Sequence, residues 1–395
     1  MSEKLTVAIV GAGIGGISAA LCLLEGGIDV HVYEQSQALG EVGAGLQIGP
    51  NASRILARLG LIEALSRTSV SAKALLQRRW EDGSTLLRIP LAEVAERAFG
   101  APHFHVLRAD LLAVLVGALP PERLHLGQRF VHCQPLGERV QLEFEGGGHA
   151  LADALVGADG LRSRVRQALA GPDQPRFTGC VAYRGLIPAE RLSALRLDDT
   201  MQIWLGPQRH LVHYFVAGRS LLNFVAITDQ GTWSGESWSD RASTEDVLRE
   251  YQGWHEQVRA ILAEASDPFV WALCDRPPLA KWSSGCVTLL GDACHPMLPS
   301  FGQGASQAIE DGATLAGCLL ARRANVPEAL ARYEALRLPR TSRVQQMSAQ
   351  NRERFHLPDG PAQRERDAQL ARGGPDPAVA WLFSHDAWAA GRDAA

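Results

Sequence analysis

The chain has 395 residues, of which 46% are hydrophobic and 21% charged, and its formal net charge is -4. This usage is typical of a globular protein long enough for more than one domain. The small negative charge, without a block of like charges, gives no reason to expect a nucleic acid or an anionic membrane as partner. No apolar run approaches the roughly 20 residues that span a bilayer.

The seven cysteines lie far apart, are odd in number and form no C-x-x-C pair. They predict neither a disulfide framework nor a metal site, and they favour a reducing, cytoplasmic compartment. A β-rich run begins within the first ten residues, so we expect no secretory signal before it.

The N-terminal stretch 7–34 combines a strand, a glycine-rich turn, a helix and a second strand. In its G-x-G-x-x-G pattern, Gly11 permits a tight turn, Gly13 lets the backbone approach a pyrophosphate, and Gly16 lets the helix pack on the sheet. Glu34 ends the second strand and is placed to accept hydrogen bonds from a ribose. These residues predict a dinucleotide site without distinguishing NAD from FAD.

The next segments alternate between helix and strand patterns. Asn51 is expected to cap a helix, and Trp80–Ile89 is expected to form a hairpin that turns at Asp82-Gly83. A buried strand ends at Asp159-Gly160, a dipeptide that is also the commonest of turns, so its role stays open here. Residues 176–275 alternate in polarity and predict a long antiparallel sheet with one helix near 244–265.

A parallel-strand pattern returns at residues 287–290, and Gly291-Asp292 follow it. The carboxyl end of such a strand is where ligands bind in open α/β sheets, so Asp292 can bind a ribityl chain; alternatively, it only caps the next turn. A long helix opens at residues 302–305, and its positive end would stabilise a reduced isoalloxazine ring. Both features favour FAD, because NAD has no ribityl chain.

These patterns predict an α/β fold with a Rossmann-like FAD-binding domain, and the family resemblance described next implies the GR2 type of this domain. We expect this domain to be discontinuous, over residues 1–175 and 276–355, with C-terminal helices. A β-rich substrate domain is inserted at residues 176–275, and residues 356–395 are expected to form a surface tail.

Three motifs, GAGIGG with Glu34, VGADG at 156–160 and GDACHPMLPSFGQGASQAIEDG at 291–312, resemble the signatures of the single-component (class A) flavoprotein aromatic hydroxylases. Their order and spacing match this family across nearly the whole chain. GAGLQIGPNASRILARLGL, HVLRADLL and FHLPDGP are most similar to the group of salicylate hydroxylase, 3-hydroxybenzoate 6-hydroxylase and 6-hydroxynicotinate 3-monooxygenase.

The resemblance implies a set of FAD contacts. The residues implied are Gly15, Glu34 and Gln35 at the adenosine half, Arg108 and the backbone of Val131 along the cofactor, Asp159 in a motif linked with FAD and nicotinamide binding, Asp292 at the ribityl or phosphate region, and Gly304 and Ala305 at the pyrimidine edge. Gln47 joins this set at a position where a close relative has His. The chain has no second G-x-G-x-x-G, which fits a family whose reductant docks transiently.

The family also implies the reaction. NAD(P)H, with NADH favoured, reduces FAD, O2 adds at C4a to give a hydroperoxide, and the distal oxygen goes to an electron-rich ring. The implied substrate is a monohydroxylated aromatic acid of the 3-hydroxybenzoate or salicylate type, in aromatic catabolism, or alternatively a hydroxynicotinate-type heteroaromatic. A homodimer is expected on the same grounds. No arginine stands out as partner of a substrate carboxylate.

A base near the substrate hydroxyl is needed, because a phenolate is a better oxygen acceptor than a phenol. Side chains alternate along a strand, so His210 and Tyr214 face one way and His213 the other. The family has a His and a Tyr four residues apart on such a strand, which implies His210 and Tyr214 as the catalytic pair; an isolated His in a sheet is more often structural. Weaker candidates are His103, His105 and Tyr183.

The rival functions are a flavin or NAD dehydrogenase that does not use O2 and a non-enzymatic flavoprotein. The missing redox cysteine pair and the glycine-rich element at residues 291–305 argue against the dehydrogenase.

Overall fold

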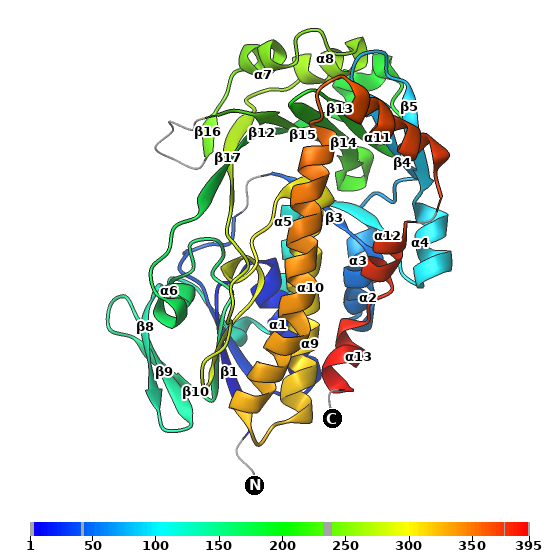
Figure 1. The fold of residues 1–395 in the computed structure, drawn as a ribbon. Helices are drawn as coiled ribbons and strands as arrows, with labels where there is room; N and C mark the ends of the chain where they lie inside the picture. The colour runs from blue at the N-terminus through cyan, green and yellow to red at the C-terminus, as the bar shows by residue number, and fades with distance from the viewer. Residues whose placement is uncertain (1–3, 41–42, 232–238, 375, 394–395) are drawn as a thin grey trace.

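The computed structural model describes residues 4–40, 43–231, 239–374 and 376–393 (Figure 1). Its central layer is a five-stranded parallel sheet in the order β18-β11-β1-β2-β7. Val7, Ile9 and Val30 have no exposed surface in this sheet, as expected where both faces are covered. The five strands are β1 (Thr6–Val10), β2 (Asp29–Tyr33), β7 (Leu124–His125), β11 (Ala154–Gly157) and β18 (Val287–Leu289).

Helices cover this sheet. Gly312 of α9 packs so closely on α1 that a Cβ there would stand 2.8 Å from the Cα of Ala19. Around the sheet lie the helices α1 (Ile14–Glu25), α2 (Pro50–Arg58), α3 (Ile62–Ser66), α4 (Ala92–Phe99), α5 (Arg108–Ala118), α6 (Arg164–Ala170), α9 (Gly304–Ala321) and α10 (Val326–Phe355). The predicted cap of α2 is wrong: Pro50 is the first helical residue, and the Asn51 side chain donates instead to Glu310 Oε1 at 2.5 Å.

Two small sheets complete this part of the molecule. One is three-stranded and antiparallel, with β8 (Phe130–Leu136), β9 (Arg139–Phe144) and β10 (His149–Ala152); the other pairs β3 (Gly45–Ile48) with β6 (Phe104–Leu107). Short 3-10 turns are η1 (Pro121–Arg123), η2 (Ala189–Leu195), η3 (Ala217–Arg219), η4 (Gly291–Ala293) and η5 (Pro299–Phe301).

The second large layer is an eight-stranded sheet in the order β16-β17-β12-β15-β14-β13-β4-β5. Its strands are β4 (Ala74–Arg79), β5 (Thr85–Pro90), β12 (Arg176–Pro188), β13 (Thr200–Gly206), β14 (Arg209–Val216), β15 (Leu221–Asp229), β16 (Ser239–Arg241) and β17 (Phe269–Asp275). The predicted hairpin is confirmed as β4 and β5, but it joins this sheet by pairing β4 in parallel with β13. The eight-stranded sheet therefore includes β4 and β5, which precede the predicted domain boundary at residue 175.

The two faces of this sheet differ. Leu211 and Phe215 pack under α7 (Thr244–Glu250) and α8 (Glu256–Ala263), which lie over the top of the sheet in Figure 1. Val212 and Tyr214 pack on the opposite side in one cluster with Phe355, at the end of α10. The predicted alternation along β14 is therefore confirmed. In Figure 1, α10 runs from the parallel sheet to the eight-stranded sheet and links the two layers.

The C-terminal segment is more than a surface tail. It forms α11 (Pro361–Arg372), α12 (Pro377–Phe383) and α13 (Ala387–Arg392). Trp388 is 6% exposed, and Gly391 lies so close to α9 that a Cβ there would stand 2.6 Å from the carbonyl oxygen of Thr314. This segment was expected on the surface because of its Pro, Gly and Ala content, yet small residues are what a close helix contact requires.

A buried ion-pair network joins α9 to α10. Arg337 donates to Asp311 at 2.6 Å and to Glu310 at 2.5 Å, and Arg340 donates to Glu310 at 2.7 Å. His295 lies 2.6 Å from Asp311. Burial raises the pKa of Glu310, but Arg337 and Arg340 outweigh this effect and hold that pKa below its ordinary value.

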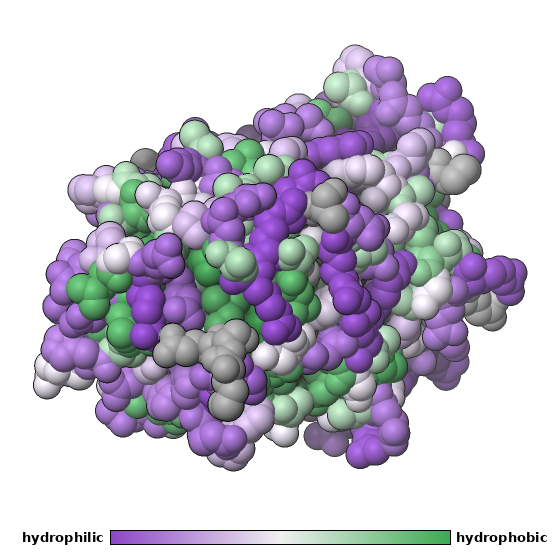
Figure 2. Space-filling view, turned by 90° about the horizontal axis from the view of Figure 1, so that it is seen from below, coloured by the Kyte–Doolittle hydropathy of each residue, from purple (hydrophilic) through white to green (hydrophobic). Residues whose placement is uncertain are grey.

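Hydrophobic and hydrophilic residues are mixed on the outer surface (Figure 2). Figure 2 shows hydrophobic residues scattered among hydrophilic ones on the face seen from below. None of the helices in the described part of the chain is long and apolar enough to cross a bilayer.

Candidate cofactor and substrate site

A cavity of about 520 Å³ opens where the parallel strands end. The turns after β1, β2, β11 and β18 line it, so it lies at the carboxyl edge of the sheet. All but three of the predicted cofactor residues line this cavity: Gly11, Gly13, Gly15, Glu34, Gln35, Arg108, Asp159, Asp292, Gly304 and Ala305.

Each glycine of the glycine-rich turn is required for a different steric reason. Gly11 has φ +107°, and a Cβ there would lie 2.4 Å from the carbonyl oxygen of Ala158. A Cβ on Gly16 would lie 2.0 Å from the carbonyl oxygen of Gly11, so Gly16 sits beneath the turn and outside the cavity. At Gly13, by contrast, nothing lies within 4 Å of the added Cβ. Gly13 thus leaves open the space that a pyrophosphate needs.

Two helix N-termini belong to the cavity wall. Neither α1 nor α9 has a side-chain cap or an acidic residue in its first turn. Their first N–H groups are therefore available to a ligand, and the helix dipoles favour negative charge there. This donor set fits the pyrophosphate and the electron-rich ring edge of FAD.

Two carboxylates of the cavity are held differently. Glu34 accepts from the backbone N–H groups of Ala12 and Ser36, each at 2.9 Å, which fixes its orientation. Its remaining lone pairs stay available to ribose hydroxyls. Asp292 is exposed to the cavity and makes no hydrogen bond with another described residue. An unengaged carboxylate at this edge suits a polyol chain.

Asp159 has a structural task in addition to its place in the wall. Its carboxylate accepts from the Ser163 hydroxyl at 2.5 Å and from the backbone N–H groups of Arg164 and Val165 at 2.7 and 3.2 Å. It therefore anchors the start of α6, as a turn-and-cap interpretation requires.

Val131 and Gln47, like Gly16, lie outside the cavity wall. Val131 is 50% exposed on β8, while its neighbour Phe130 lines the cavity. Gln47 lies on β3 against Gly302, where an added Cβ would stand 3.1 Å from the Gln47 amide. Gln47 therefore contacts the loop that leads into α9.

The predicted catalytic pair lies on the face of the eight-stranded sheet that is opposite α7 and α8. Tyr214 is 3% exposed and packs on the His105 ring at 4.3 Å. His210 is fully buried, and its Nδ1 lies 2.6 Å from Nε2 of His356. Neither residue lines the 520 Å³ cavity. His213 points to the other face, where it accepts from Trp204 Nε1 at 3.3 Å.

The sequence interpretation missed Arg184. Arg184 of β12 pairs with Val225 of β15, which in turn pairs with Val212 of β14. Across the sheet, Arg184 therefore lies level with a position between His210 and Tyr214. Its Nε is buried without a hydrogen bond, and its guanidinium makes no ion pair with a described carboxylate. Alternation along β12 could have placed it on this face, but its lack of a partner is visible only in three dimensions.

The electrostatics around Arg184 are unusual for an arginine. Burial lowers its pKa, the ring of Tyr214 opposes this shift and Arg108 adds to it. The guanidinium lies 5.8 Å from the Trp271 ring. The pKa of Arg184 is thus influenced both by Tyr214 of the predicted catalytic pair and by Arg108, which lines the cavity.

Fold and cavity together define a dinucleotide-binding flavoprotein with an attached eight-stranded layer. The family model described as an FAD binding domain matches residues 4–348. The chain belongs to this family and is an FAD-dependent aromatic monooxygenase of the single-component type.

Similar proteins agree with this assignment. The chain is 40% identical to 3-amino-4-hydroxybenzoate 2-monooxygenase of Streptomyces cremeus, over 98% of this chain and 97% of the relative. It is 39% identical to 6-hydroxynicotinate 3-monooxygenase of Pseudomonas fluorescens, over 89% of this chain and 92% of the relative. A salicylate hydroxylase substrate complex superimposes with a TM-score of 0.85 at 29% identity, covering 100% of this chain and 99% of the other. The resemblance inferred from the motifs is confirmed.

Proposed function

We propose that this chain uses FAD, NAD(P)H and O2 to hydroxylate an aromatic acid that carries a ring hydroxyl. One observation carries the proposal: a partly buried cation that forms no ion pair with a described residue, Arg184, shares a sheet face with His210 and Tyr214. A ring with a carboxylate and a hydroxyl complements this set. The 3-hydroxybenzoate and salicylate types remain the preferred substrates, and hydroxynicotinate and aminohydroxybenzoate types are further members of the class.

Each residue has a part in the reaction. Arg184 binds the carboxylate, because a guanidinium forms two parallel hydrogen bonds with it. His210 accepts the proton of the ring hydroxyl, which raises the electron density of the ring. Tyr214 orients the substrate ring by packing and by its hydroxyl. Val212, between the two, is partly exposed and leaves room beside them.

The cavity residues hold the cofactor. Glu34 binds the ribose, the N-terminus of α1 the pyrophosphate, Asp292 the ribityl chain, and the N-terminus of α9 the ring. The chemistry that FAD supplies is hydride acceptance and transfer of one oxygen atom of O2. NAD(P)H, O2 and one proton are consumed for each hydroxylated product, with release of NAD(P)⁺ and water. NADH is the proposed donor, and the cytoplasm, where all seven unpaired cysteines stay reduced, the proposed compartment.

The test is to purify the protein, record its flavin spectrum, and follow NADH and O2 consumption with 3-hydroxybenzoate, salicylate, 6-hydroxynicotinate and 3-amino-4-hydroxybenzoate. One product hydroxyl per NADH supports the proposal. A flavoprotein that oxidises NADH without consuming O2 would instead indicate the dehydrogenase alternative. A flavoprotein that yields only H2O2 with every member of this panel would refute the substrate class.

A further inference from the structure

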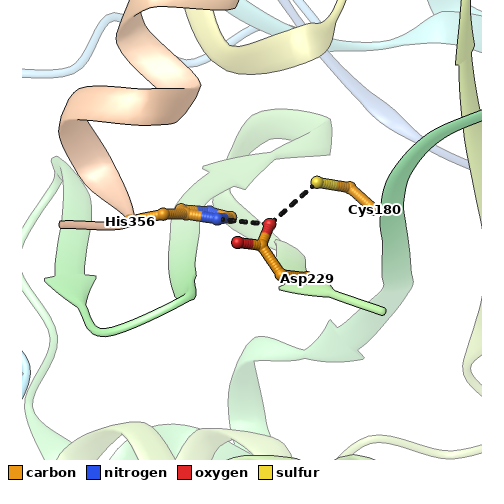
Figure 3. Close-up of side chains that lie close together, drawn as sticks. All are labelled: Cys180, Asp229 and His356. Atoms are coloured by element: carbon orange, nitrogen blue, oxygen red, sulfur yellow. Dashed lines mark hydrogen bonds and ion pairs between the residues drawn. The ribbon is translucent and has the colours of Figure 1, made fainter. Parts of the chain in front are cut away.

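A chain of hydrogen bonds leads from His210 toward the surface. His210 Nδ1 lies 2.6 Å from His356 Nε2, and His356 Nδ1 lies 2.8 Å from Asp229 Oδ1. His356 follows the last residue of α10, and Asp229 ends β15. Figure 3 shows the Asp229 carboxylate between the His356 ring and the Cys180 thiol. The side chain of Asp229 is 30% exposed, whereas that of His356 is 4% exposed.

This geometry fixes where the ring protons lie. Partial burial raises the pKa of Asp229, but hydrogen bonds from His356 and Cys180 outweigh it and hold that pKa below its ordinary value. Asp229 is therefore an acceptor, and His356 Nδ1 must be the donor. In the neutral His356 ring the lone pair is then on Nε2, so His210 Nδ1 must carry a proton. The only lone pair left to the neutral His210 ring is on Nε2.

His210 Nε2 has no partner within the described chain. It is buried and makes no hydrogen bond there, although an unsatisfied buried acceptor is costly. Burial lowers the pKa of His210 well below its ordinary value, so the ring is neutral. The next side chain on the same face, Val212, is partly exposed. Nε2 thus offers a lone pair to a ligand that enters beside Val212.

We propose that His356 and Asp229 are positioning residues that hold His210 as a base and carry the proton of the substrate to solvent. The inference rests on the proposed function. The ring hydroxyl of the substrate gives its proton to His210 Nε2. His210 Nδ1 passes its own proton to His356 Nε2, and His356 Nδ1 passes one to Asp229. Asp229 releases that proton to water at the partly exposed end.

The remaining neighbours do not interrupt this path. Burial and Asp229 raise the pKa of the Cys180 thiol to about 12, so it stays protonated and donates to Asp229 at 3.0 Å. Arg352 also donates to Asp229 Oδ1 at 3.0 Å. The Tyr251 hydroxyl donates to the His210 carbonyl at 2.8 Å. Cys180, Asp229 and His356 are also spaced as metal ligands, but the Arg352 cation occupies the same carboxylate oxygen.

The first experiment determines which ring nitrogen of His210 carries the proton when no substrate is present. Ring ¹⁵N NMR of the FAD-bound enzyme is expected to show His210 protonated at Nδ1 and bare at Nε2. In the Asp229→Asn variant the amide oxygen is expected to take the place of Oδ1, on which the His356, Cys180 and Arg352 donors converge, so both tautomers should be kept while the acceptor of the relayed proton is lost. His210 protonated at Nε2 in the wild type would overturn the relay. So would a tightly bound metal ion in stoichiometric amount.

The second experiment measures the reaction. Asp229→Asn is expected to reduce the hydroxylation rate by about 100-fold or more, the usual range for loss of a positioned base. FAD content and the rate of flavin reduction by NADH should be unchanged, and the pH at which the bound substrate ionises should rise by about one unit or more. Asp229→Glu should restore part of the rate. Cys180→Ala is the matched control, since it contacts the same carboxylate but lies outside the path.

The two outcomes separate the hypotheses. Asp229→Asn that hydroxylates within about threefold of wild type, with unchanged substrate ionisation, would overturn the relay while leaving the proposed function intact. A wild type that shows the expected tautomer but hydroxylates no ring-hydroxylated acid would instead overturn the proposed function and, with it, the transfer of a substrate proton.

Discussion

Gly16 lies against Gly11 so closely that a Cβ on Gly16 would stand 2.0 Å from the Gly11 carbonyl oxygen. We therefore expect Gly16→Ala to destabilise the apoprotein by about 1–3 kcal/mol, as overpacking does, and to weaken FAD binding. Gly13→Ala is the matched control, because its Cβ would meet nothing within 4 Å. It should fold like wild type and lose only FAD affinity. Urea unfolding of the apoprotein and FAD titration separate the two; equal unfolding midpoints would contradict the packing argument.

Removal of the Glu34 carboxylate should weaken FAD binding. Glu34→Ala loses an acceptor for the ribose and frees the backbone N–H of Ala12. Hydrogen bonds to a charged group contribute about 1.5–3 kcal/mol, so the Kd for FAD is expected to rise roughly ten- to a hundredfold. Flavin fluorescence during titration of the apoprotein measures the change. Full flavin occupancy at wild-type Kd would remove Glu34 from the ribose site.

Arg184→Met should raise the KM for a carboxylated substrate. Truncating one partner of a buried charge pair costs about 2–5 kcal/mol, which predicts an increase of at least 30-fold. The activity with an uncharged phenol should hardly change, and FAD should stay bound. Arg176→Met is the control, because Arg176 forms an exposed ion pair with Asp275. Steady-state kinetics with acid and amide forms of one substrate decide the matter: equal losses for both would exclude carboxylate binding by Arg184.

Arg337→Met should be strongly destabilising. The substitution leaves Glu310 and Asp311 buried with too little compensating charge, and breaking a buried pair costs about 3–5 kcal/mol. Arg67→Met, which removes an exposed pair with Glu63, should leave the unfolding midpoint nearly unchanged. Chemical denaturation of both variants provides the comparison, and similar midpoints would contradict a structural role for the network.

Stability should fall with acidification. Burial lowers the pKa of His103 to about 4 and that of His213 to about 3, below the ordinary value. Below pH 6.5 the unfolded state takes up protons that the folded state refuses, so stability is lost as the pH falls, at up to about 1.4 kcal/mol per unit for each histidine. The lowered pKa of Glu310 extends the loss below pH 4. Tm measured from pH 7.5 to 4 tests this, and a flat profile above pH 4.5 would contradict it. His103→Asn should make the profile shallower.

The features that could be predicted from the sequence are those determined by residues close together in the chain. The Gly11–Gly16 turn, the strands around it and the alternation of His210 and His213 depend on local geometry. The pairing of β4 with β13 joins segments over a hundred residues apart, and no local pattern encodes that choice. The same holds for Asn51, whose amide has Glu310 as a better partner than the end of its own helix.

His356 is a residue of the candidate site that could not be predicted from the sequence. In the sequence it is one histidine in a segment rich in charged residues, and its spacing to His210 carries no signal. Its role depends on α10 reaching the eight-stranded sheet, a tertiary contact between residues 146 positions apart. Arg184 was missed for a related reason, since lack of a counter-ion is a property of the folded surroundings.

The discontinuous parallel sheet has a consequence for synthesis. The glycine-rich turn leaves the ribosome early, yet β18, Asp292 and the N-terminus of α9 follow some 275 residues later, and α13, which packs on α9, follows later still. Domains generally fold as units during translation, N-terminal ones first. Here the nascent chain cannot complete the lining of its cofactor cavity until Gly304, Ala305 and Ala308 have emerged. FAD can therefore be enclosed only after the strands β12–β17 have been made, and a chain that stops before α9 should yield colourless protein.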